Sequence, residues 1–124
     1  MCSVRRGIIL GAAILACTVL IYTYWPTETH NIPVHVSVVL EEKGFQPREI
    51  TVKKGGTVTF STVRNKPFWP ASNLHPSHTI YSEFDPLRPL QPTETWQFTF
   101  DRLGDWAYHD HLRSYYVGTV HVVE

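Results

Sequence analysis

Two histidines on either side of one acidic residue are the part of this chain best suited to chemistry. They lie in the segment Trp106-Ala107-Tyr108-His109-Asp110-His111, which is followed by the strand-like segment Gly118-Thr119-Val120-His121-Val122. Imidazole nitrogens and carboxylate oxygens are ligands of Cu(II) and Zn(II). The pattern therefore predicts a metal site at the mouth of a β-sandwich.

The geometry of this site depends on where the strand that carries it ends. If the chain is still extended at His111, then His109 and His111 point to the same face and can converge on one ion. If the chain turns at Asp110, one histidine and the aspartate face the site instead. Asp110 could also accept a hydrogen bond from an imidazole N–H, or brace the loop through Arg113. Both geometries keep the three residues 109–111 at or beside one metal.

The first 25 residues have the composition of a membrane anchor. Gly7 to Trp25 is a run of 19 positions without a charged residue, preceded by Arg5 and Arg6. An apolar run of about 20 residues spans a bilayer as a helix, whereas the apolar part of a cleavable signal is nearer about 7–15. Residues 1–25 are therefore predicted to be a transmembrane anchor or uncleaved signal, with the two arginines in the cytoplasm.

Two other fates of this segment lead to the same location. Lipidation at Cys17 and signal cleavage near Thr27 would each also deliver the rest of the chain to the extracytoplasmic side, periplasmic or extracellular. We expect residues 26–33 to be a linker and residues 34–124 to form one domain.

Charge and cysteine content narrow the classes of function. Without Arg5 and Arg6, nine basic residues remain against 11 acidic ones, a formal charge of −2, and no basic cluster favours a nucleic acid partner. Both cysteines, Cys2 and Cys17, lie in the N-terminal segment, so the predicted domain has no thiol and no disulfide. Its stability must come from its core.

Period-two alternation of apolar residues predicts short strands and no helix in the domain. The strands are expected in a meander-like arrangement at first, with turns at 54–56 and 101–105. The predicted strands cover residues 34–40, 50–52, 58–60, 96–100, 106–108 and 117–123.

The chain changes character between Asn65 and Pro92. Six of the nine prolines and two of the seven histidines fall there. Because proline cannot donate to a β-ladder, this segment is predicted to be a long ordered loop outside the sheets. Long loops in small domains are often functional, so it is the expected binding face.

Two strings of residues resemble the beginning and the end of the cupredoxin fold. The first is Gly44-Phe45-Gln46-Pro47 with Ile50-Thr51-Val52-Lys53-Lys54-Gly55-Gly56-Thr57-Val58-Thr59-Phe60, and the second is Phe100, Gly104-Asp105-Trp106-Ala107-Tyr108-His109 and Gly118-Thr119-Val120. They are most similar to amicyanin-like and plastocyanin-like domains. The resemblance implies an all-β, Greek-key sandwich or barrel of the cupredoxin type over residues 34–124, and copper as the cofactor.

The chain departs from that family at the metal ligands. Counting back from Gly118, Asp110 stands where the family carries its copper cysteine, Arg113 where it carries a second histidine, and Tyr116 where it carries an axial methionine. A blue copper centre needs a thiolate on the metal. We therefore expect this domain to lack a type 1 site and the rapid electron transfer that such a site supports.

The resemblance also places the first copper histidine on the loop after the third strand. His75-Pro76-Ser77-His78 lies there; His78 fits the usual register, and His75 also could. The segment Tyr108 to His111 is similar to the Tyr-His-x-His of multicopper oxidases, and His-Pro-x-His to another of their ligand segments. The predicted metal ligands are His78, His109 and His111, with Asp110 and His75 as further candidates.

The sequence also predicts the surroundings of four other side chains in the proline-rich segment. Phe68 and Trp69 are expected to cover the metal region and limit the entry of water. Glu83 and Asp85 are expected to be solvated or bonded to turn amides, and not to be ligands.

The leading hypothesis is a membrane-anchored, extracytoplasmic protein that binds copper, as Cu(II), for holding, delivery or resistance. Nitrogen and oxygen ligands without sulfur also suit zinc and give little affinity for Cu(I). One alternative is an oxidase-like or other metal-dependent oxidoreductase whose site is completed at an oligomer interface. Another is a metal-free accessory module of a membrane complex. The expected partners are the copper ion, the membrane through residues 1–25, and a membrane complex or a copper-trafficking protein.

Overall fold

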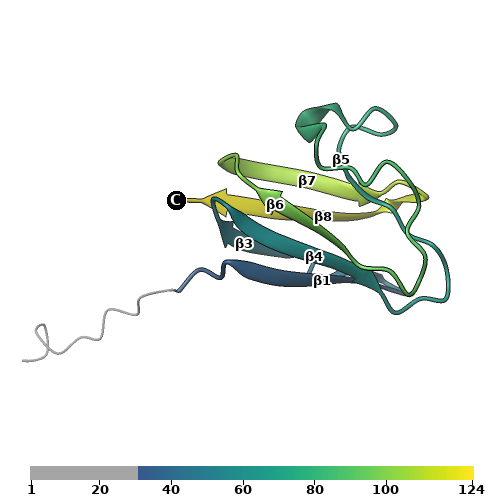
Figure 1. Ribbon diagram of the computed structural model, residues 1–124. Coiled ribbons are helices and arrows are strands. Elements are labelled where there is room, and N and C mark those ends of the chain that lie inside the picture. The colour runs from purple at the N-terminus through teal and green to yellow at the C-terminus, as the bar shows by residue number, and fades with distance from the viewer. Residues whose placement is uncertain (1–30) are drawn as a thin grey trace, which may run out of the picture. The chain divides into compact units, whose positions relative to one another are not determined.

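Two four-stranded sheets pack face to face in this protein (Figure 1). The computed structural model describes residues 31–124, of which 32–124 form one compact unit. The first sheet has the order β2-β1-β4-β6, built from Gly44–Gln46, His35–Glu41, Gly56–Thr62 and Trp96–Phe100. The second has the order β3-β8-β7-β5, built from Glu49–Lys53, Arg113–Val123, Gly104–Asp110 and Pro70–Ser72.

The core lies between the sheets, because alternate residues of each strand point inward. In β4, Val58 and Phe60 are fully buried, and in β3 the same holds for Val52. Trp96 and Trp106 pack against this core, as strand spacing predicts. The all-β sandwich and the expected strands are therefore confirmed.

The expected meander is wrong. Strand β1 pairs in parallel with β4, and β3 pairs in parallel with β8, so both sheets are mixed. Parallel neighbours need a crossover connection, and between β2 and β4 of the first sheet the chain passes through β3 of the second. Alternation within a strand says which face is buried, but not which strand lies alongside.

The proline-rich segment is more regular than expected. It contains the short strand β5, which pairs with β7 at the edge of the second sheet, and a 3-10 turn, η1 (Thr79–Tyr81). Pro70 is the first residue of β5, a position at the end of an edge strand where a missing N–H is tolerated. The rest of the segment is loop, anchored by the isolated bridge between Phe68 and Leu90.

Strands β7 and β8 form a hairpin that closes tightly. Pairing runs from Gly104 opposite Val122 to Asp110 opposite Arg113, which leaves only His111 and Leu112 in the turn. Strand β8 is thus longer at its start than the predicted 117–123. The register shifts between His109 and Asp110, because His109 is opposite Val117 whereas Asp110 is opposite Arg113, which leaves residues 114–116 of β8 without a paired residue in β7.

No helix within residues 31–124 has the length and apolar character needed to cross a lipid bilayer. The anchor predicted at residues 1–25 lies outside the described residues.

Tyr108 and Gly118 meet at the centre of the hairpin. They are paired residues, and a Cβ on Gly118 would lie 2.4 Å from Tyr108 Oη. The Tyr108 ring is fully buried against Phe45 and Phe60, and its hydroxyl has no hydrogen-bond partner among the described residues. Burial raises the pKa of this hydroxyl far above its usual value, so it stays neutral. The glycine makes room for the ring that connects the site strand to the core.

We expect Gly118→Ala to lower the free energy of unfolding by about 1–3 kcal/mol, the usual cost of overpacking a core. Denaturant unfolding followed by tryptophan fluorescence measures this change. Ser114→Ala, at an exposed position of the same strand, is the control and should change little. Equal stability of the two variants would show that the Tyr108 ring can move aside.

Candidate metal centre

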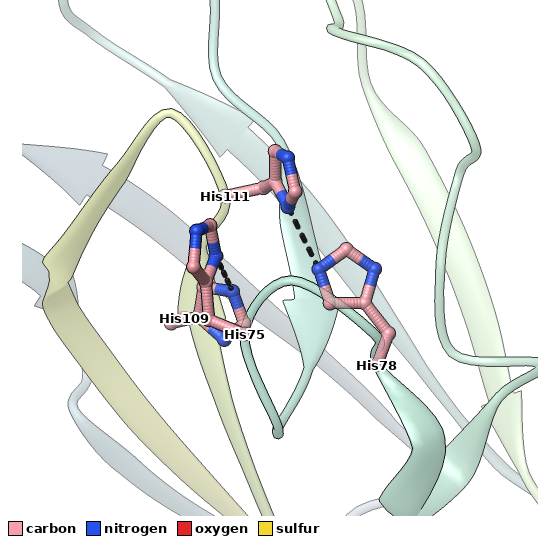
Figure 2. A group of neighbouring side chains, drawn as sticks. All are labelled: His75, His78, His109 and His111. Carbon is pink, nitrogen blue, oxygen red and sulfur yellow. Dashed lines mark hydrogen bonds between the residues drawn. The ribbon is translucent and has the colours of Figure 1, made fainter.

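Four histidines from two separate segments meet at one end of the sandwich (Figure 2). His75 and His78 come from the loop after β5, His109 from the end of β7, and His111 from the hairpin turn. One potential ligand nitrogen from each lies within 4.8 Å of all the others. We refer to these residues as the four-histidine group. The metal ligands predicted at these four positions are thus brought together.

Two hydrogen bonds within the group identify the nitrogen atoms that face one another. His75 Nδ1 lies 3.1 Å from His109 Nε2, and His111 Nδ1 lies 2.8 Å from His78 Nε2 (Figure 2). Each bond needs one N–H and one lone pair. The inward-facing atoms are therefore Nδ1 of His75 and His111 and Nε2 of His78 and His109, and these are the atoms that could hold a metal.

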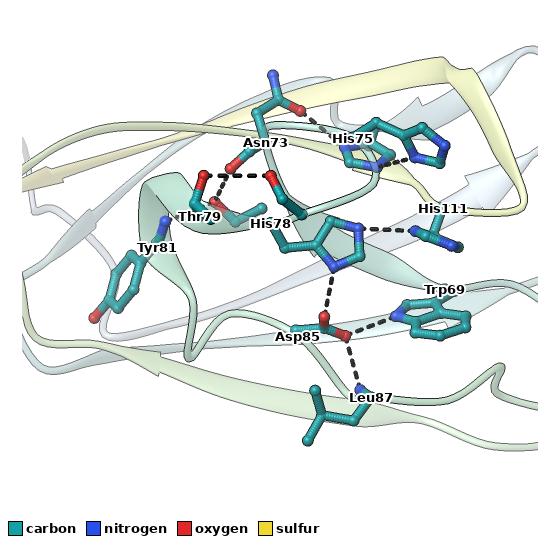
Figure 3. Close-up of polar contacts among 12 residues, drawn as sticks. Trp69, Asn73, His75, His78, Thr79, Tyr81, Asp85, Leu87 and His111 are labelled. Carbon is teal, nitrogen blue, oxygen red and sulfur yellow. Dashed lines mark hydrogen bonds and ion pairs between the residues drawn. The ribbon is translucent and has the colours of Figure 1, made fainter.

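The ring nitrogen of His78 that faces away from the group is hydrogen-bonded to a carboxylate (Figure 3). Its Nδ1 lies 2.5 Å from Asp85 Oδ2, and both side chains are nearly buried, with exposed fractions of 5% and 9%. Asp85 also accepts hydrogen bonds from the Trp69 indole and the Leu87 amide, each at 2.7 Å. The Nδ1 proton on this side leaves the lone pair of Nε2 directed into the group.

Asn73 orients the His109 ring in the way that Asp85 orients the His78 ring. Its Oδ1 accepts a hydrogen bond from His109 Nδ1 at 2.8 Å, which places the lone pair on Nε2. The His109 ring is 2% exposed and lies under the loop that carries His75. Asn73 also holds the turn itself, because the Ile80 amide donates to its backbone carbonyl at 2.9 Å.

His111 is positioned by Trp69. The His111 amide donates to the Trp69 carbonyl at 2.8 Å, and the two rings lie with centroids 4.4 Å apart. Trp69 therefore lies beside the metal region, as expected. Phe68 does not, since its ring is fully buried in the core; the expectation that it covers the site is wrong.

Asp110 points away from the four-histidine group. Its Oδ1 accepts from the Trp69 amide at 2.7 Å, and its Oδ2 accepts from Arg113 Nε at 2.9 Å, with no exposed surface. Arg113 also donates to the Pro67 carbonyl. His109 and His111 converge although β7 ends at Asp110 and His111 lies in the turn, so the extended strand expected for this convergence is absent. Asp110 braces the loop through Arg113, which is one of the expected alternatives. Its role as a metal ligand stays a prediction that this geometry does not favour.

The three positions that the sequence resemblance assigned to a cysteine, a histidine and a methionine make hydrogen bonds outside the four-histidine group. Asp110 and Arg113 bond each other, and the Tyr116 hydroxyl donates to the Glu42 carbonyl at 2.9 Å. Among residues 31–124 there is no cysteine. The described part of the chain thus offers imidazole nitrogen in place of thiolate.

Two residues that hydrogen-bond the four-histidine group, Asn73 and Asp85, were not predicted from the sequence to do so. Asn73 carried no signal, and Asp85 was expected to be solvated or bonded to a turn amide, whereas it bonds Leu87 and also His78. A carboxylate seven residues after a candidate ligand in a buried loop was a usable clue. An asparagine two residues before His75 was not.

Crowding and burial lower the pKa of two rings of the group, those of His109 and His111. Burial, and then repulsion from His78, His75 and His111, lowers the pKa of His109 to about 4. Burial together with His78 and His75 also lowers the pKa of His111. Burial alone would raise the pKa of Asp85, but hydrogen bonds from His78, Trp69 and Leu87 lower it below its ordinary value. These shifts favour the neutral form of His109 and His111, which is the form that binds a metal ion, and the charged form of the nearby carboxylate.

Comparisons with solved structures support the cupredoxin fold. The chain is similar to a purple cupredoxin from Nitrosopumilus maritimus, with 19% identity, a TM-score of 0.62, and coverage of 71% of this chain and 99% of that one. Amicyanin from Paracoccus versutus has 20% identity, a TM-score of 0.62, and coverage of 82% and 87%. A reduced Cu(I) form of an amicyanin mutant has 18% identity, a TM-score of 0.62, and coverage of 76% and 87%.

No family model and no curated protein matches the sequence. The three-dimensional likeness therefore establishes the fold, and the resemblance seen in the sequence is confirmed at that level.

We expect the metal-free domain to lose stability as the pH falls from about 6.5 towards 4. The pKa of His109 is about 4 in the fold, against 6.5 for an unperturbed histidine side chain. The unfolded chain therefore binds more protons in this window, and protonation favours unfolding. His109→Gln should reduce the slope of unfolding free energy against pH, measured by urea titrations between about pH 4 and 7. A variant with the wild-type slope would contradict this assignment.

Proposed function

We propose that this protein binds one copper ion through the four-histidine group. The observation that carries the proposal is the convergence of four imidazoles, two of them buried, from segments more than 30 residues apart. Four histidines in contact are costly when they have no ligand, because their rings repel once protonated and lose hydration when buried. Binding of a divalent cation would stabilise this contact among the four histidines.

The size of the group is suitable for a transition metal. Bonds from imidazole nitrogen to such metals are about 2.0–2.1 Å long, so opposite ligands lie within about 4 Å of each other. The widest separation in the group is 4.8 Å. Small rotations of the side chains would close the difference.

Ion binding replaces the two internal hydrogen bonds of the group. The N–H that each of His75 and His111 directs inward must move to the outer ring nitrogen, Nε2. The outer nitrogens of His78 and His109 keep their protons, because Asp85 and Asn73 accept them. The two braced rings thus need no rearrangement.

The ligand chemistry favours copper in its oxidised state. Imidazole without sulfur suits Cu(II) and Zn(II), and Cu(II) is the more tightly held of the two at a given nitrogen site. The charge of Asp85 beside His78 adds a preference for the more highly charged ion. The similar amicyanin that was solved with Cu(I) is consistent with copper chemistry on this fold.

Four protein ligands favour holding an ion over catalysis. Closed sites with four protein ligands are typical of structural metals, whereas catalytic sites usually keep one position open. We therefore propose copper holding, delivery or resistance as the function. The uncharged run at residues 7–25 supports a location on the extracytoplasmic face of a membrane, where the domain would meet copper before the cytoplasm does.

Metal titration tests the ligand set. The wild-type chain should bind one Cu(II) with four nitrogen ligands by electron paramagnetic resonance, without the intense blue absorption of a copper thiolate. We expect His78→Ala to weaken binding by more than about 100-fold, because it removes a ligand and also leaves Asp85 Oδ2 without its hydrogen bond. His35→Ala, which changes an exposed histidine of β1, is the control. A stoichiometry below one, or a preference for zinc in competition, would refute the proposal.

A second variant tests the carboxylate behind His78. Asp85→Asn should weaken Cu(II) binding by about 10–100-fold, because Trp69 and Leu87 occupy Oδ1 and the new amide nitrogen would face the N–H of His78, which then lacks an acceptor. It should also raise the Cu(II)/Cu(I) potential, because a negative charge near the ion is removed. Glu83→Gln removes an exposed carboxylate of the same loop, paired with Arg102, and should do neither. Equal effects in both variants would mean that the charge acts only at long range.

A further inference from the structure

The four histidines differ in what holds them from outside the group. His78 has the Asp85 carboxylate, His109 has the Asn73 amide, and His111 has the carbonyl and ring of Trp69. His75 has none of these. Its side-chain hydrogen bond within the described part of the chain goes to His109, which is itself a member of the group (Figure 2).

His75 is also the member of the group that faces solvent. It is exposed, whereas His78 and His109 are buried and His111 is intermediate. Its neighbour on the turn, Leu74, is 59% exposed. The turn that carries His75 is therefore the part of the site that borders water, and the other three histidines are more shielded from solvent.

The free-energy cost of turning a ring away from the group also differs between His75 and the two buried histidines. Turning His78 away would leave Asp85 Oδ2, on a side chain that is 9% exposed, without its hydrogen bond, and turning His109 away would leave Asn73 Oδ1 without its donor. Polar groups that are largely shielded from water and lose a partner raise the free energy of the fold. Turning His75 outward breaks one bond inside the group and moves an already exposed ring into water.

We propose that His75 is the exchangeable ligand, through which copper enters and leaves the site. This inference rests on the proposed function and specifies how it operates. The incoming group is a neutral nitrogen donor of imidazole type, such as a histidine on a copper-accepting protein. The bond from the ion to the incoming nitrogen forms as the bond to His75 breaks, and no electron or net proton is transferred.

The proposal predicts a three-ligand site when His75 is removed. We expect His75→Ala and His75→Gln, in the full chain, to bind one Cu(II) with affinity reduced by only about 10–100-fold. Free imidazole should then bind to the loaded variants and restore the four-nitrogen resonance spectrum. Wild-type protein should show no change with the same imidazole concentration.

Transfer kinetics provide the decisive measurement. In stopped-flow mixing of copper-loaded protein with excess EDTA, both His75 variants should release Cu(II) at least about 10-fold faster than wild type, matching their weaker binding. The control His35→Ala should release it at the wild-type rate. A His75 variant that loses binding as completely as His78→Ala, or that fails to take up imidazole, would overturn the proposal.

The outcome also separates this inference from the proposed function. If wild-type protein binds no Cu(II), both fail. If it binds Cu(II) through four nitrogens but its His75 variants release the ion at the wild-type rate, copper binding stands and His75 is an ordinary ligand.

Discussion

The buried pairing of Asp110 with Arg113 determines the geometry of the whole site. Asp110 has no exposed surface, and its two oxygens are taken by the Trp69 amide and the Arg113 side chain. Arg113 reaches on to the Pro67 carbonyl. One ion pair thus closes the β7–β8 hairpin and attaches it to the loop before β5. Because the aspartate points away from the group, the histidines on either side of it can both point in.

The same pairing explains why histidines, and not residues 110 and 113, meet at this end of the sandwich. Asp110 and Arg113, the positions that the sequence resemblance assigned to a cysteine and a histidine, are paired across the hairpin and bond each other. The four-histidine group is formed instead by the residues on either side of Asp110 and by the loop after β5, which lies against the hairpin turn through the contact between His78 and His111.

The environment of the site favours the neutral form of two imidazoles and the charged form of one carboxylate. Burial and repulsion within the group lower the pKa of His109 and His111, whereas three hydrogen bonds lower the pKa of Asp85. A negative charge beside neutral nitrogen donors favours a cation. Three of the rings have partners outside the group, and His75 does not.

Local pattern was sufficient for the all-β class and for the longer strands, because side-chain direction along a strand depends on neighbouring residues alone. The alternation around Val58 reports burial directly, and histidines at two-residue spacing indicated His109 and His111, whereas His75 and His78 were indicated by the resemblance to cupredoxins. The short strand β5 and the pairing of strands became known from the three-dimensional structure, since a strand alternates in the same way whichever neighbour it has. The orientation of Asp110 goes with a register shift in the hairpin, and Asn73 joined the site through a contact across 36 residues. Hydrogen-bond partners are set by proximity in space, which spacing along the chain does not encode.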